Sequence, residues 1–184
     1  MLITEKTLAE GCLRGDRNAQ KQLYETYSGF MLGLCLRYVG DQPTAEDLMH
    51  DCFIHVLTHF DQYRWQGEGS LKSWLLTIQR NLALAHLRKN DELKNALSIE
   101  DNLTSVDMPE PETIRDIPRQ KLLQLIAELP VGYRTVFNMH VIDGLPHKEI
   151  ANLLGIHEKS SSSQLLHARR LLAEKINKWR NENL

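Results

Sequence analysis

The segment Leu145-Pro-His-Lys-Glu-Ile-Ala-Asn-Leu-Leu-Gly-Ile-His-Glu158 carries the signals of two helices joined by a tight turn. Its proline suits the first turn of a helix, and its glycine allows the positive φ at which helices commonly end. Ile150 and Leu154 lie four residues apart and so share one face, and Ala151 is small enough to let a second helix cross closely. The segment therefore predicts a helix-turn-helix whose second helix covers about residues 159–179.

The second helix of this motif has one apolar and one polar face. We expect its buried face to comprise Leu165, Ala168, Leu172 and Ile176. Short hydroxyl and amide groups followed by arginines can meet base edges while the cations hold phosphates. This pattern favours DNA binding, and a plain helical hairpin with a solvated face is the alternative. The polar face is expected to carry Ser162, Ser163, Gln164, His167, Arg169 and Arg170.

Helical periodicity also dominates the rest of the chain. After a break at residues 40–44, apolar side chains recur at intervals that alternate between three residues and one residue. This rhythm predicts one face of a long amphipathic helix. No strand-like alternation of useful length occurs, so we predict an all-α protein of two small domains. The residues of the rhythm are Ala45, Leu48, Met49, Cys52, Phe53, Val56, Leu57 and Phe60.

Composition places the chain among ordinary soluble globular proteins. Its 184 residues are 42% hydrophobic and 25% charged, with a net charge of −2. The cysteines, Cys12, Cys35 and Cys52, are odd in number and lie in apolar helical patterns, which indicates buried reduced thiols and a cytoplasmic protein. No apolar run approaches the roughly 20 residues of a membrane helix, so no membrane insertion is expected.

The small net charge is a cancellation between opposite blocks. Residues 41–61 carry −5 and residues 91–118 carry −6, whereas residues 62–90 and 119–184 carry +4 each. Prolines interrupt the helical pattern in the second acidic block, which indicates a flexible linker. We therefore predict domains over residues 1–90 and 119–184, joined by an acidic linker over 91–118, as expected for a two-site polyanion binder.

Two further stretches resemble a known family. The run Ala45-Glu-Asp-Leu-Met-His-Asp-Cys-Phe-Ile-His-Val-Leu57 and the run Ser73-Trp-Leu-Leu-Thr-Ile-Gln-Arg-Asn81 resemble the first conserved domain (region 2) of extracytoplasmic-function (ECF) sigma factors of the sigma-70 family. The helix-turn-helix is similar to their second conserved domain (region 4). The resemblance implies an alternative sigma factor, which is not an enzyme, needs no cofactor, and directs RNA polymerase to promoters.

The resemblance also implies a polymerase-binding helix. In the family this helix docks on the clamp helices of the largest catalytic subunit of core RNA polymerase, while the second domain meets the flap of the second subunit. An acidic segment flanked by apolar residues suits a basic coiled coil. His50 stands where the family usually has glutamine. The implied core-binding residues are Asp47, His50, Asp51 and Leu57.

The next segment of the family reads the minus-ten promoter element as a single strand and flips a non-template base into a pocket. Here the resemblance implies a pocket made by the loop over residues 63–71 and the helix after it. Unpaired bases stack on aromatic rings and bond to amides. Trp74 could instead be a core residue, and Asn81 could bridge helices. The implied minus-ten contacts are Tyr63, Trp65, Trp74, Arg80, Asn81, Arg88 and Lys89.

In the second domain the resemblance implies contacts to the minus-thirty-five element. Ser162, Gln164 and His167 stand where relatives often carry Arg or Lys, and Lys159 replaces a common glycine. The bases that this chain prefers therefore cannot be copied from relatives. The implied contacts are Lys159, Ser162, Ser163, Leu166, His167 and Arg169.

Other function classes are less consistent with the residues. His55 and His59 are spaced to chelate zinc with His50, Asp51 or Cys52 nearby, but no HExxH or CxxC pattern is present. We expect no metal site and no catalytic residue. A stand-alone helix-turn-helix regulator that does not bind core polymerase is the second candidate. The family also makes an anti-sigma factor a possible partner.

Overall fold

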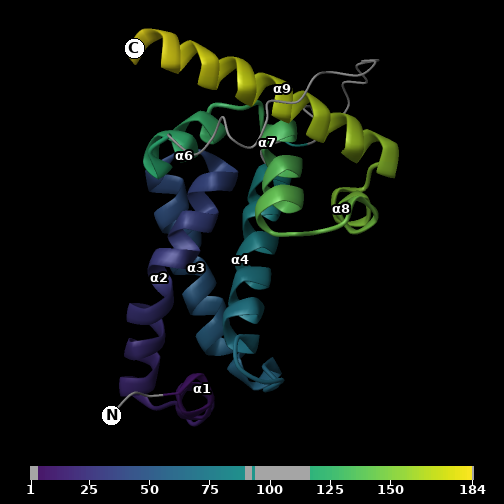
Figure 1. The fold of residues 1–184 in the computed structure, drawn as a ribbon. Helices are drawn as coiled ribbons and strands as arrows, with labels where there is room; N and C mark the ends of the chain where they lie inside the picture. The colour runs from purple at the N-terminus through teal and green to yellow at the C-terminus, as the bar shows by residue number, and fades with distance from the viewer. Residues whose placement is uncertain (1–3, 90–92, 94–116, 184) are drawn as a thin grey trace. The chain divides into compact units, whose positions relative to one another are not determined.

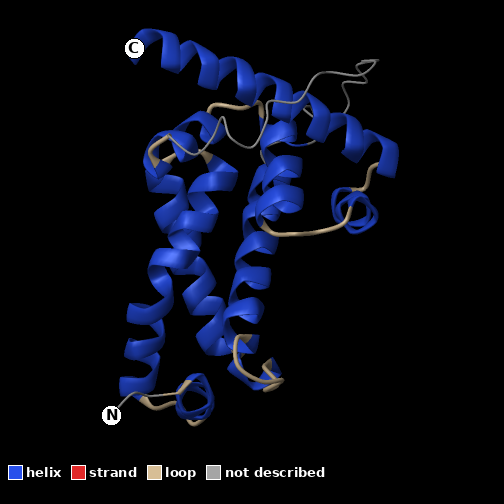
Figure 2. Cartoon of the chain, viewed as in Figure 1, coloured by secondary structure: helices blue, strands red, loops and turns tan. Residues whose placement is uncertain are grey.

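The structure is a computed structural model that describes residues 4–89, 93 and 117–183 (Figure 1). The chain forms two compact units, Met1–His86 and Leu87–Leu184. Every regular element in these described ranges is a helix, which confirms the all-α prediction (Figure 2). The predicted linker, apart from Leu93, Ile117 and Pro118, lies outside the described residues.

The first unit is a helical bundle in which side-chain caps set the helix starts. The carboxylate of Asp16 accepts a hydrogen bond from the N–H of Asn18 at 2.8 Å, and that of Asp41 accepts one from the N–H of Thr44 at 3.0 Å. Such caps satisfy backbone donors that the first turn leaves unpaired. The elements are α1 (Glu5–Leu13), α2 (Arg17–Val39), α3 (Gln42–Thr58), the 3-10 turn η1 (Phe60–Gln62) and α4 (Ser70–Lys89), whose last three residues fall in the second unit.

The apolar rhythm of residues 45–60 faces the interior as predicted. Ala45, Cys52 and Val56 are fully buried in α3, and Phe60 follows them into the core. The polar side chain of Gln79 on α4 is also fully buried, and its amide donates to the carbonyl of Leu48 at 3.2 Å and to the thiol of Cys35. These bonds join α4 to both α2 and α3, which fixes the face that α4 turns outward.

The second unit contains the predicted helix-turn-helix. Gly155 ends the first helix in the left-handed conformation at φ 69°, which an L side chain adopts only with strain. Ile150, Ala151 and Leu154 are buried, as expected. The elements are α6 (Arg119–Ala127), α7 (Val131–Phe137), the π-helical turn η3 (Asn138–Ile142), α8 (His147–Leu154) and α9 (Glu158–Asn183).

The apolar stripe of α9 follows the predicted spacing. Leu165, Ala168, Leu172 and Ile176 are all buried. The helix runs several residues past the predicted end, because no glycine or proline follows Trp179 to stop it.

The cysteines are buried and free, which confirms the prediction of reduced thiols. Burial raises the pKa of Cys12 to about 11 and that of Cys35 and Cys52 to about 12. In the described part of the chain, none of the helices has both the length and the apolar character needed to cross a bilayer.

Candidate nucleic-acid interface

The acidic residues of α3 form an exposed surface on the first unit. Asp47, His50 and Asp51 are exposed and lie on one side of the helix, at spacings of three and four. The ring of His50 lies parallel to that of Tyr24 on α2, with an angle of 3° between the planes, and its Nε2 is 3.3 Å from the Tyr24 hydroxyl. The surface therefore combines two carboxylates with an imidazole that a neighbouring helix holds in place.

Sequence reasoning missed one residue of this surface. Ile54 continues the face of Asp47 and Asp51 by another turn, and 63% of its side chain is exposed. The sequence could have indicated this residue, because Ile54 is apolar but does not fit the spacing of the residues expected to be buried in α3. Leu57 is half-buried and packs against the core, so only part of its side chain can meet a partner.

The hydroxyl of Ser70 bonds to several points of the loop between η1 and α4. Ser70 Oγ donates to the carbonyl of Gly67 at 2.6 Å. The same oxygen lies 2.7 Å from the hydroxyl of Tyr63 and accepts the N–H of Gln66 at 3.3 Å. One side chain thus bonds to three points of the loop over residues 63–70, which we call the 63–70 loop.

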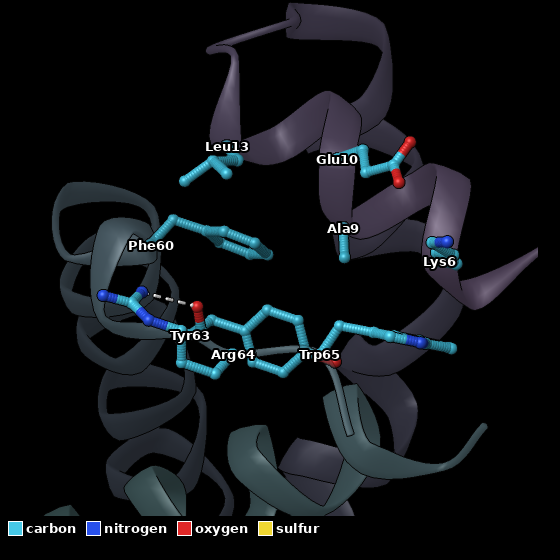
Figure 3. A pocket seen from close by; sticks show the side chains of 8 residues that line it. All are labelled: Lys6, Ala9, Glu10, Leu13, Phe60, Tyr63, Arg64 and Trp65. Carbon is cyan, nitrogen blue, oxygen red and sulfur yellow. Dashed lines mark hydrogen bonds between the residues drawn. The ribbon is translucent and has the colours of Figure 1, made fainter. Parts of the chain in front are cut away.

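A cavity of about 350 Å³ lies between α1 and the start of the 63–70 loop (Figure 3). The ring of Phe60 and those of Tyr63 and Trp65 lie on the loop side, and Ala9 and Leu13 of α1 lie opposite them. Lys6, Glu10 and Arg64 complete the lining. α1 supplies the second wall of this cavity, and Trp74 and Asn81 do not line it, so the base pocket expected between the loop and α4 stays a prediction.

The aromatic residues of the loop differ in their accessibility. Tyr63 is only 8% exposed and packs between Phe60 and Trp74, whose ring centroids lie 5.7 and 5.2 Å away. Burial raises the pKa of its phenol, and the hydrogen bond with Ser70 opposes that shift. Tyr63 therefore supports the loop from inside the unit, and its implied contact with the minus-ten strand stays a prediction. Trp65 and Trp74 are half-buried against the same core.

The outward face of α4 carries the remaining predicted minus-ten residues. Trp74, Asn81 and Arg88 are spaced by seven residues and therefore follow one side of the helix. Asn81, Arg88 and Lys89 are exposed, whereas Arg80 is half-buried. An amide and cations on one helix side can bond to bases and to phosphates.

The predicted recognition residues of α9 divide into two groups. Lys159 and Ser162 are exposed, and Ser163, Leu166 and Arg169 are half-buried. His167 is only 7% exposed and its ring stacks on that of Tyr133, with centroids 5.1 Å apart. Gln164 is buried as well. The expectation that His167 and Gln164 face outward is therefore wrong, and Tyr133 of α7 covers the ring of His167.

A buried hydroxyl ties α8 to α9. Ser161 is fully buried, and its Oγ lies 2.9 Å from Nδ1 of His147, the first residue of α8. The ring of His147 stacks on that of His140 with centroids 4.3 Å apart. Within the four consecutive serines at 160–163, Ser161 thus packs inside the motif, whereas its neighbour Ser162 is exposed.

His55, in the last turn of α3, and His59, which directly follows this helix, lack the further partners of a metal centre among the described residues. The rings of His55 and His59 lie 4.4 Å apart, and Nδ1 of His59 is 2.9 Å from the carbonyl oxygen of His55. Over residues 4–89, 93 and 117–183, no group of three or more His, Cys, Asp or Glu side chains is arranged to hold a metal ion.

The described residues thus form two helical units, with an acidic helix face and a loop-bounded cavity in one and a helix-turn-helix in the other. Residues 23–92 match the family described as Sigma-70 region 2, and residues 119–172 match Sigma-70, region 4. The chain belongs to the ECF group of the sigma-70 family. It is an alternative sigma factor that directs transcription initiation, and a stand-alone helix-turn-helix regulator is not favoured.

Similar proteins align with most of this chain and over most of their own length. RNA polymerase sigma-H factor of Pseudomonas aeruginosa is 27% identical over 90% of this chain and 90% of its own. ECF RNA polymerase sigma factor SigM of Bacillus subtilis is 26% identical over 88% of this chain and 97% of its own. The sigma factor RpoE of Bartonella quintana, solved in complex with the anti-sigma factor NepR, has a similar fold, with a TM-score of 0.52 at 19% identity over 86% of this chain and 96% of its own.

Proposed function

We propose that the exposed face of α3 is the surface that binds core RNA polymerase, through Asp47, His50, Asp51 and the exposed part of Leu57. The observation that carries this proposal is the accessibility of both carboxylates beside the exposed Ile54. Charges at the rim steer a basic partner and fix its register, while an apolar centre supplies affinity. The partner proposed for this face is the clamp helices of the largest catalytic subunit.

The promoter contacts are proposed for other elements. Asn81, Arg88 and Lys89 on α4, with Trp65 in the 63–70 loop, present groups that suit a melted minus-ten strand. Half-buried Trp74 and Arg80 would border this path, and Tyr63 would support it. Lys159, Ser162, Ser163, Leu166 and Arg169 are the groups of α9 proposed to meet the minus-thirty-five element.

The domain limits are proposed as region 2 over residues 1–90 and region 4 over residues 119–184, with residues 91–118 as the connection. The flap of the second polymerase subunit is the proposed partner of region 4. By likeness to RpoE of Bartonella quintana, an anti-sigma factor is a proposed regulator. The proposed role is recognition without catalysis, and a chain that works with RNA polymerase would act in the cytoplasm.

Transcription with defined components tests the function. The full chain is added to core polymerase on fragments of its own genome, and run-off products are sequenced at their 5′ ends. A shared pair of motifs upstream of the new start sites, absent without the chain, is the expected result. Tight promoter binding by the chain alone, without a complex with core polymerase, would instead identify a stand-alone regulator.

A further inference from the structure

The residue that precedes α4 has no side chain to cap the helix. Gly69 precedes the first residue of α4, and its carbonyl accepts the first bond of the helix, from the N–H of Ser73 at 3.0 Å. A residue at this position normally supplies a side-chain oxygen to the free N–H groups of the first turn. Glycine has no such oxygen, and Gly69 has a φ of +85°, a conformation that L side chains rarely adopt.

The missing cap comes from a residue that is distant in the sequence but lies beside the start of α4. The carboxylate of Glu5, the first residue of α1, accepts the N–H of Gly69 on Oε2 and that of Lys72 on Oε1 at 3.0 Å. Its Oε1 also accepts the hydroxyl of Tyr27 on α2 at 3.2 Å. One ionised group therefore joins three helices at the N-terminal end of α4, where its negative charge also favours the helix dipole.

These contacts fix the end of the 63–70 loop relative to α1. Ser70, whose hydroxyl holds the inside of the loop, lies between the two residues that Glu5 holds. The cavity beside Trp65 has α1 as one wall and the loop as the other, so a shift of α1 against the loop changes its width. The first turn of α4 also places the ammonium of Lys72 4.1 Å from the centre of the exposed ring of Phe30.

We infer that Glu5 is a positioning residue for promoter reading: it clamps the 63–70 loop to α1 and so sets which bases of the single strand the region 2 unit accepts. The inference rests on the proposed minus-ten function of this unit. It concerns a residue outside the segment that matches the region 2 family, which begins at residue 23. Burial and the nearby charge of Glu5 raise the pKa of Tyr27 to about 12. The hydrogen bond that the Tyr27 hydroxyl donates to the Glu5 carboxylate adds to this rise.

The substitution Glu5→Gln tests the clamp at nearly constant volume. An amide replaces one acceptor oxygen by a donor, which must then face the N–H of Gly69 or that of Lys72. Tyr27→Phe is the matched milder variant, because it removes one donor and keeps both backbone bonds. Glu25→Gln, which alters an exposed carboxylate 3.7 Å from Lys21, is the surface control.

The first measurement is amide hydrogen exchange of the full chain in solution, at residues 69–72. Glu5→Gln should exchange about tenfold faster there, in line with the loss of one hydrogen bond to a charged group. Tyr27→Phe and Glu25→Gln should stay near the wild type. Melting curves show whether each variant is folded, and if Glu5→Gln does not fold, Glu5→Asp takes its place in both measurements.

The second measurement is selection of single-stranded oligonucleotides with a random segment by the complex of the chain with core polymerase. The wild type should enrich a motif, and Glu5→Gln should reduce the enrichment about tenfold while binding core polymerase normally. Equal enrichment by both proteins overturns the clamp and leaves the proposed function intact. If the wild type enriches no motif although it binds core polymerase, the minus-ten function and the clamp fail together.

Discussion

The imidazole rings of His140 and His147 lie face to face in the second unit, with centroids 4.3 Å apart and planes 8° from parallel. Nδ1 of His140 is 2.9 Å from the carbonyl of Leu145, and Nδ1 of His147 is 2.9 Å from the hydroxyl of Ser161. The pair thus joins η3 to the start of α8, and through Ser161 to α9. Two positive charges at this distance would repel each other.

The stability of the second unit should fall in mild acid. Burial, followed by the charge of His140, lowers the pKa of His147 below its usual 6.5; Glu158 opposes this shift and Arg169 adds to it. A lowered pKa means that the folded state binds fewer protons than the unfolded state. The contribution of neutral His147 to the free energy of unfolding is therefore complete above about pH 6.5 and decreases as the pH falls below it. Thermal melting at pH 7.5 and pH 5.5 measures the loss. His147→Gln should reduce this pH dependence, whereas His157→Gln, at an exposed position, should not; an unchanged slope in His147→Gln would contradict the assignment.

Charge reversal on α3 should strongly weaken polymerase binding. The double variant Asp47→Lys, Asp51→Lys replaces exposed carboxylates, so we expect an unchanged fold and at least about a tenfold loss of affinity for core polymerase. Size-exclusion chromatography with core polymerase and a fluorescence titration measure the loss. Asp61→Lys makes a similar change outside α3 and should bind like the wild type. Equal affinity of the double variant and this control would place the polymerase surface elsewhere.

Ile54 should matter for binding and hardly for stability. Its side chain is 63% exposed, so Ile54→Ser should change the free energy of unfolding by less than about 0.5 kcal/mol. Loss of an apolar contact at an interface should weaken core polymerase binding about tenfold. Leu48→Ala, on the same helix but 9% exposed, should cost roughly 2–5 kcal/mol in stability. Denaturant titration and the binding assay above separate the two effects, and a destabilised Ile54→Ser would mean that this face is packed in the free protein.

Asn81→Ala should impair promoter opening more than polymerase binding. The amide is exposed on α4, where an unpaired base can bond to it on its edge. We expect a decrease of about tenfold in open-complex formation, followed by permanganate reactivity of unpaired thymines. Thr77→Ala lies one turn earlier, and its hydroxyl donates to the carbonyl of Ser73, so it is the matched control. If both variants open the promoter like the wild type, Asn81 does not read the strand.

Two glycine substitutions should change stability in opposite directions. Gly155→Ala puts a Cβ on a residue at φ 69° and should cost roughly 1–2 kcal/mol. Gly29→Ala lies within α2, with nothing within 4 Å of the added Cβ, and should stabilise the chain by roughly 0.5–1 kcal/mol. Urea unfolding measures both. A neutral Gly155→Ala would show that the turn can relax without the left-handed residue.

The sequence predicted those parts of the fold that depend on short-range periodicity. The rhythm of α3 put Cys52 and Val56 inside because side chains three and four residues apart share a face. The left-handed turn at Gly155 was predictable for the same local reason. Both features are set by neighbours within two helical turns.

The parts that sequence reasoning missed depend on distant partners. His167 is buried because Tyr133 of another helix covers it, and no pattern within α9 records that contact. Glu5 caps α4 across 64 residues of sequence, from a position that looks like any acidic first turn. The exposed face of α3 was predicted only in part. Ile54 was missed, although its departure from the local spacing of apolar residues could have shown that it is exposed.

The burial of all three cysteines has a practical consequence for studying this sigma factor. Thiols with pKa values of about 11 to 12 hold almost no thiolate at neutral pH, and reagents reach them only when the core opens. A cysteine introduced at an exposed position outside the proposed contacts, such as Glu25 or Thr77, would therefore be the one fast-reacting sulfur in the chain. Dyes could be attached there without removing the native thiols, so that docking on polymerase and strand opening are followed in the otherwise natural protein.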